Sequence, residues 1–265
     1  MRNIFKWMVI AILFCKLLTI SSCNKDTETT PDQTKKIVLS NVIIYGDNLI
    51  CDSIIETYSY NAEFNITTVL TKNLATGDTI EENQYSYIDN QIIVNNKSYH
   101  SHISSQYICS IDKKGRITHI FKESENGTIT NFDYTYDTTG HIESSIIDSN
   151  LYTQYIWEDN NIVQESSLFA YSYEISNIPN QFYPINFIEY YGIPLKELSV
   201  QGCYGQIPAH LPAQMTISSY GHTDIVYKYN YTINSEGYLS SCKAKISEGT
   251  SESKTINYIF SWKKL

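Results

Sequence analysis

The sequence is poor in residues that break regular structure and in basic side chains. Among 265 residues there are only 11 Gly and 6 Pro, and charged residues make up 18%. Hydrophobic residues make up 42%, which is too apolar for a disordered chain. Lys and Arg number 19 against 28 Asp and Glu, a formal net charge of −9. Because no stretch is rich in Lys or Arg, this balance excludes nucleic acid and anionic lipid headgroups as partners.

The local signatures of several enzyme classes are also missing. The chain has no Gly-x-Ser-x-Gly, no His-Glu-x-x-His and no Gly-rich phosphate loop. His100 and His102 have a spacing that can hold zinc, but no third ligand is visible near them. The carboxylates that could serve a glycosidase are Glu158, Asp159, Glu189 and Glu197, and the sequence does not select a pair. We therefore predict no enzyme, no cofactor and no metal site.

The N-terminus has the pattern of a secretory signal. Arg2 and Lys6 precede an apolar run over residues 7–15, which is too short to span a bilayer. Ile20-Ser21-Ser22-Cys23 resembles a bacterial lipobox, in which the cysteine is acylated before cleavage. The sequence thus predicts a signal peptide over residues 1–22 and lipidation of Cys23. Removing three basic residues with the peptide leaves 16 Lys and Arg against 28 acids, a net charge of −12.

Residues 23–36 follow as a predicted flexible tether, because no apolar residue occurs between Asn24 and Lys36. The stretch from Lys25 to Glu28 resembles the charged export signal of Bacteroidetes lipoproteins. That resemblance implies a lipid-anchored protein of the outer membrane that faces the cell exterior. Four cysteines remain in this oxidising compartment, and they form structural disulfides or stay as buried thiols. They are Cys51, Cys109, Cys203 and Cys242.

Tyrosine is the residue in excess, with 23 Tyr beside 9 Phe and 3 Trp. From Tyr58 onward the chain repeats a phrase of alternating aromatic residues, an Asp or Asn, a Gly and an Ile or Leu, best seen over residues 132–142. A period of two places the rings on one face of a strand. Asp137 can bond the backbone ahead of it, and Gly140 can take the positive φ of a short turn. This pattern predicts an antiparallel up-and-down meander.

One segment interrupts the rhythm, because five of the six prolines fall between Pro179 and Pro212. The segment is too apolar for a solvated loop, so we expect an irregular insertion around 179–212 that packs against the sheet. A short helix is predicted over Pro184–Tyr191 or Pro194–Val200. Strands resume at Gln214, and residues 37–265 are expected to form a single all-β domain.

The Tyr-x-Tyr-Asp-x-x-Gly-x-Ile phrase resembles the tyrosine-aspartate repeat of Rhs-type shells. It is more similar to an uncharacterised family of Bacteroidetes lipoproteins with a porin-like fold, a similarity that also includes the stretches 190–192, 209–217 and 227–239. The resemblance implies a strongly curved antiparallel sheet or incomplete barrel. It carries no catalytic residues, since its motifs specify strands.

Two functions compete on these data. The first is a binding module for a glycan or peptide on the cell surface, in which exposed rings stack on the ligand. Its predicted ligand-binding residues are Tyr183, Tyr190, Tyr191, Tyr204 and Trp157. The second is a structural or envelope-assembly protein without a small ligand, in which every tyrosine belongs to the core. A transmembrane barrel is the rival architecture, because lipid-facing strands also alternate aromatic residues; we predict instead a domain that folds in water.

Overall fold

The computed structural model describes residues 36–47, 51–149, 151–167, 169–180, 193–218, 223–249 and 253–265. The chain divides into two compact units. The terminal unit comprises Met1–Lys36 with Lys264–Leu265, and in it the backbone N–H of Leu265 donates to the carbonyl of Lys36 at 3.0 Å. The predicted signal peptide, the lipidation site Cys23 and nearly all of the tether lie outside the described residues. The Ile37–Lys263 unit contains the sheet and the core.

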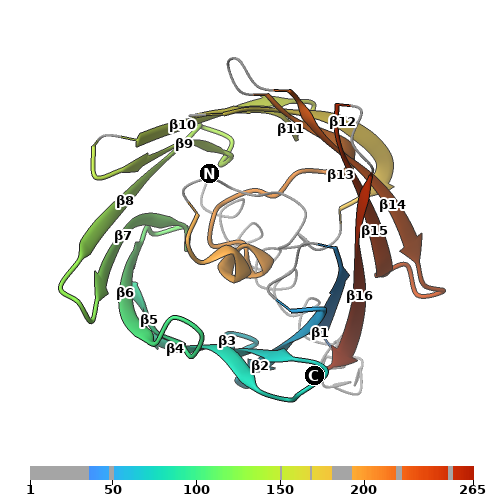
Figure 1. The fold of residues 1–265 in the computed structure, drawn as a ribbon. Helices are drawn as coiled ribbons and strands as arrows, with labels where there is room; N and C mark the ends of the chain where they lie inside the picture. Colours follow the sequence, from blue (N-terminus) through green and yellow to red (C-terminus); the bar gives the residue numbers. More distant parts are fainter. Residues whose placement is uncertain are drawn as a thin grey trace, which may run out of the picture. The chain divides into compact units, whose positions relative to one another are not determined.

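The described residues of this second unit form sixteen antiparallel strands and one short 3-10 helix, η1. The strands are β1 (Ile37–Gly46), β2 (Ser53–Tyr60), β3 (Ile66–Asn73), β4 (Thr79–Ile88), β5 (Gln91–Ser98), β6 (Ile103–Ile111), β7 (Ile117–Ser124), β8 (Ile129–Tyr136), β9 (Ile142–Ile147), β10 (Leu151–Glu158), β11 (Asn161–Ser166), β12 (Ala170–Pro179), β13 (His210–Ser218), β14 (Ile225–Ile233), β15 (Leu239–Glu248) and β16 (Lys254–Lys264). Each strand pairs with its neighbours in the chain, and β1 pairs with β16 to close a barrel (Figure 1).

The prediction of an antiparallel up-and-down meander is confirmed. The structure is more closed than the predicted strongly curved sheet or incomplete barrel, because the first and last strands are joined. Closure has a physical reason: it gives partners to the backbone groups that two edge strands would leave unpaired. Residues alternate between the two faces of a strand in an open sheet and in a barrel alike. The sequence pattern alone therefore could not show whether the sheet closes.

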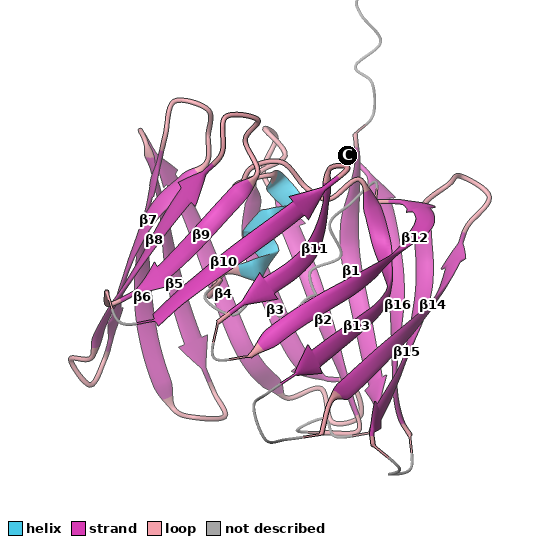
Figure 2. Ribbon diagram, turned by 90° about the horizontal axis from the view of Figure 1, so that it is seen from above, coloured by secondary structure: helices cyan, strands magenta, loops and turns pink. Residues whose placement is uncertain are grey.

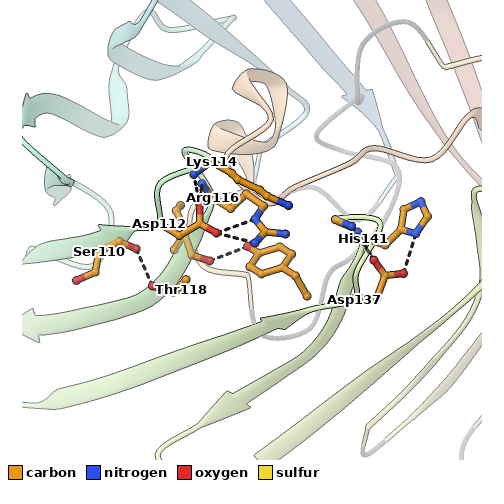
Figure 3. Close-up of polar contacts among 10 residues, drawn as sticks. Ser110, Asp112, Lys114, Arg116, Thr118, Asp137 and His141 are labelled. Atoms are coloured by element: carbon orange, nitrogen blue, oxygen red, sulfur yellow. Dashed lines mark hydrogen bonds and ion pairs between the residues drawn. The ribbon is translucent and has the colours of Figure 1, made fainter.

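The turns that follow the repeated phrase are built as predicted. Asp137 Oδ1 accepts hydrogen bonds from the backbone N–H groups of Gly140 at 2.7 Å and His141 at 2.9 Å, and Gly140 has a φ of 101°. In the preceding hairpin, Asp112 Oδ1 likewise accepts from the backbone of Arg116, and its Oδ2 accepts from that guanidinium (Figure 3). Burial would raise the pKa of Asp112, but the hydrogen bonds from Arg116 hold it below its ordinary value. These aspartates are therefore turn residues.

Most of the buried apolar side chains point into the barrel, and the alternation along each strand sets this pattern. On β8, Phe132 and Tyr134 are buried, whereas Asp133 between them is exposed. The same alternation buries Tyr171 and Tyr173 on β12. Together with other inward residues they form one hydrophobic core between the strands. Burying a ring of this size stabilises the fold by roughly 1.5–3 kcal/mol, which accounts for much of the tyrosine excess.

Residues 193–209, which we call the plug, enter the lumen between β12 and β13. They include η1 (Lys196–Gln201), which lies inside the ring of strands in both views (Figures 1 and 2). The predicted helix over Pro194–Val200 is confirmed within a residue or two, and the alternative over Pro184–Tyr191 lies outside the described residues. Leu195 and Leu198 of the plug are 1% and 0% exposed, so the described part of the insertion packs into the core as predicted.

The up-and-down topology gives the barrel two rims. One rim carries the turns β2–β3, β4–β5, β6–β7, β8–β9, β10–β11 and β14–β15, and we call it the plug rim because the β12–β13 connection enters there. The start of β1 at Ile37 lies on the same rim. The opposite rim carries the turns β1–β2, β3–β4 and β5–β6, among others. The plug crosses the lumen near the plug rim, since it bonds Ile117 and Gly140, which adjoin the turns there.

Candidate functional site

A cavity of about 330 Å³ lies in the lumen between η1 and strands β2, β3 and β4. Ile54 and Ile80 line it near the starts of their strands, so the cavity is on the opposite-rim side of the plug. The Lys196 side chain, which also lines it, is 46% exposed, so the cavity communicates with solvent. Its volume falls near the lower end of the roughly 300–1,000 Å³ usual for small-molecule sites.

Two inward rows of neighbouring side chains build the cavity wall. Glu56 on β2 pairs with Thr71 on β3, and Thr71 pairs with Glu81 on β4. The adjacent row places Val69 between Tyr58 and Asn83. Cross-strand neighbours have Cβ atoms roughly 4.5–5.5 Å apart, so the two glutamates flank Thr71 on one face.

The protein's own donors hold the carboxylates of the wall and of η1 in place. Tyr58 donates its hydroxyl to Glu56 Oε2 at 2.8 Å, and Asn96 donates to Glu81 Oε1 at 2.6 Å. Glu197 Oε1 on η1 accepts from Asn83 Nδ2 at 3.0 Å and from the Tyr85 hydroxyl. These bonds join the plug to β4 and fix each carboxylate through one of its two oxygens.

The electrostatics of the site follow from burial. Glu197 is 5% exposed, and this desolvation raises the pKa of its carboxyl above the ordinary value, although the hydrogen bond from Tyr85 acts in the opposite direction. Burial, followed by the charge of Glu56, raises the pKa of Tyr58 well above that of free tyrosine. Lys196 Nζ lies 3.8 Å from Glu56 Oε1 and partly balances the acids. The carboxylates of Glu56, Glu81 and Glu197 thus make the site rich in hydrogen-bond acceptors.

Sequence reasoning identified Glu197 as a carboxylate of interest and did not identify Glu56 or Glu81. A signal for both exists in the strand pattern. Glu56 is two residues from Tyr58, and Glu81 is four residues from Tyr85, so each acid shares a strand face with a buried tyrosine. That face turned out to line the inside of the barrel. An acidic residue on the apolar parity of a strand is the feature that points to such a site.

The predicted ligand-binding aromatics lie elsewhere. Tyr183, Tyr190 and Tyr191 are outside the described residues. Tyr204 is 6% exposed and packs edge to face against Tyr134, with ring centroids 5.4 Å apart. Trp157 is half-buried, stacks on His141 at 4.2 Å and donates its indole N–H to the carbonyl of Ile142 at 2.7 Å. A ligand on these rings remains a prediction.

Glu158 ends β10 and Asp159 lies in the turn after it, both exposed, whereas Glu189 is outside the described residues. His100 and His102 lie exposed in the β5–β6 turn, and no described group of three or more His, Cys, Asp or Glu could hold a metal ion. Cys51, Cys109, Cys203 and Cys242 are free thiols. In the part of the chain that the structure describes, no helix has the length and apolar character needed to cross a membrane.

The comparisons with known proteins concern the fold. No protein-family model matches the chain, and no curated protein matches it. Among solved structures, a porin-like protein from Bacteroides uniformis ATCC 8492 aligns with a TM-score of 0.64 and 17% identity, over 85% of this chain and 98% of that one. A porin-like protein from Bacteroides vulgatus ATCC 8482 aligns over 86% and 99% of the two chains, with 10% identity and a TM-score of 0.33. At 17% identity the first likeness shows the fold alone: the chain is built like a porin-like Bacteroides protein.

Proposed function

We propose that the protein is a lipid-anchored binding module of the bacterial cell surface, which captures a glycan or a peptide in the lumenal cavity. The observation that carries the proposal is the cavity itself. It is a solvent-connected space lined by Glu56, Glu81 and Glu197, inside a lumen where many other described inward side chains pack into one hydrophobic core. Its polar residues are held by hydrogen bonds before any ligand arrives, an arrangement that reduces the entropy cost of binding.

The proposed anchor leaves the cavity accessible from the medium. Acylation of Cys23 would tie the chain to the lipid through the residues before β1. Because residues 23–36 are expected to form a flexible tether, the barrel can turn freely and meet a ligand in the medium.

The outer face supports a barrel that stands in water. A lipid-spanning barrel carries an apolar outward band about 25 Å tall. Here Lys228 pairs with Lys245, and Asn230 with Lys243, on the exposed side of β14 and β15. Gln84, Asn95, Gln106 and Glu123 form a polar row across β4 to β7. The row beside it is apolar, with Ile93, Ile108 and Phe121, and Ile156 and Ile259 are exposed on other strands, so apolar and polar side chains are interspersed on the outer face.

A glycan and peptide array probed with the purified protein tests the proposal. We expect saturable binding that Thr71→Trp abolishes, because the ring would fill the cavity between Glu56 and Glu81. The matched control is Thr68→Trp, which adds the same ring to the outer parity of β3 and should bind normally. A blank array with correctly folded protein would contradict ligand capture and favour a structural or envelope-assembly role.

A further inference from the structure

We infer that the lumenal cavity binds an aliphatic ammonium group, carried by a lysine side chain or by a free diamine. The inference rests on the proposed binding function and names the chemistry of its ligand. It follows from three features of the cavity: carboxylate oxygens left without a hydrogen-bond donor among the described residues, aliphatic side chains beside them, and a lysine of the chain itself that already approaches the acids.

The unoccupied acceptors are the second oxygens of the wall glutamates. Glu56 is 7% exposed; its Oε2 accepts from Tyr58, and among the described residues its Oε1 has only Lys196 nearby, at 3.8 Å. Glu81 Oε1 accepts from Asn96, whereas no described residue donates to Glu81 Oε2. A buried carboxylate is costly unless its charge is matched. A ligand that brings donors and positive charge is therefore favoured, and an anionic ligand is excluded.

Aliphatic side chains beside the acids select the carrier of that charge. Ile54 and Val69 lie on the strand wall with Glu56, and Ile193 and Pro194 line the cavity from the plug. A chain of methylenes ending in an ammonium matches this lining, since its apolar stem can lie on the aliphatic residues while its head meets the glutamates.

Lys196 shows how such a group approaches the acids. Its stem comes from η1, and its Nζ stands 3.8 Å from Glu56 Oε1, beyond hydrogen-bond distance. Because this side chain is 46% exposed, a competing ammonium can take its place beside Glu56 while the lysine head turns to solvent. The chain's own lysine thus balances the cavity charge until a better-placed amine arrives.

Isothermal titration of the purified full chain at pH 7 tests the inference with three probes. They are the acetylated and amidated tripeptide Gly-Lys-Gly, the same peptide with norleucine in place of lysine, and the diamine cadaverine. We expect the lysine peptide, the diamine or both to bind and the norleucine peptide not to bind. Comparing the lysine peptide with cadaverine shows whether the ammonium group comes from a peptide or from a free diamine. Replacing both Glu56→Gln and Glu81→Gln should weaken binding by about tenfold or more.

The matched control is the double variant Glu123→Gln and Glu125→Gln, which removes the same charge from β7 and the turn after it, outside the cavity, and should bind as the wild type does. Equal affinity for the norleucine peptide, or no binding of either amine, overturns the inference. A third outcome separates the two proposals: neither amine binds, but the array shows saturable binding that Thr71→Trp abolishes. In that case the proposed ligand capture is supported and the ammonium inference is wrong.

Discussion

Glu165 is a buried acid that the proposed site does not use. It is 0% exposed, its Oε1 accepts from the Tyr173 hydroxyl at 2.7 Å, and its Oε2 has no hydrogen-bond partner among the described residues. Desolvation raises the pKa of this carboxyl to about 8, against the opposing effect of the Tyr173 bond. The folded barrel therefore holds Glu165 protonated at neutral pH, whereas the unfolded chain releases the proton near pH 4.5.

This difference predicts the pH dependence of stability. Between about pH 4.5 and about pH 8 the folded state binds one more proton than the unfolded state, so the free energy of unfolding falls as pH rises through that window. For Glu165 the total is at most about 5 kcal/mol. Glu165→Gln should remove this contribution and flatten the slope, as measured by urea unfolding at several pH values. The same slope in the variant and the wild type would contradict the assignment.

The contact of the plug with the β8–β9 turn depends on a single glycine. Gly205 has a φ of 85°, and a Cβ there would lie 2.3 Å from the carbonyl oxygen of Gly140 and 3.0 Å from the Tyr136 ring. Next to it, Gln206 donates its backbone N–H to that same carbonyl at 2.9 Å. A side chain at position 205 must therefore push the plug away from the wall.

Gly205→Ala should lower the free energy of unfolding by roughly 2–4 kcal/mol, the sum of a positive-φ cost and a steric clash. Gly127→Ala is the control, because Gly127 has a φ of 79° but a Cβ would meet no described atom within 4 Å. It should cost only about 1 kcal/mol. Equal losses in the two variants would show that the plug is not tightly seated at this point.

The strands and turns could be predicted from the sequence where they depend on residues close together in the chain. Alternation at Phe132 to Tyr136 predicted the strand, and the Asp137 to Gly140 spacing predicted the turn, because both depend on residues within reach of each other. The position of η1 inside the barrel depends on long-range contacts such as Glu197 with Tyr85. The cavity depends on the register that places Glu56, Thr71 and Glu81 side by side, and a sequence does not state which strands pair.

For the whole molecule, the proposed lipid anchor makes a separate prediction. Cys23→Ala removes the only thiol that follows the small residues Ser21 and Ser22, so acylation cannot occur. We expect the variant to appear in a soluble fraction or as uncleaved precursor, as measured by membrane fractionation and mass spectrometry. A variant that remains membrane-bound and is processed at the same place would contradict lipidation.

The central proposal is that this barrel stands in water and does not span a membrane. Lys228, Lys243 and Lys245 on the outer face would each cost about 2–4 kcal/mol at the middle of a bilayer, which favours an outer face in water. Sedimentation velocity and circular dichroism of residues 37–265, prepared without detergent, measure this directly. The account predicts a monodisperse, β-rich protein; a chain that folds only when detergent is added would contradict it.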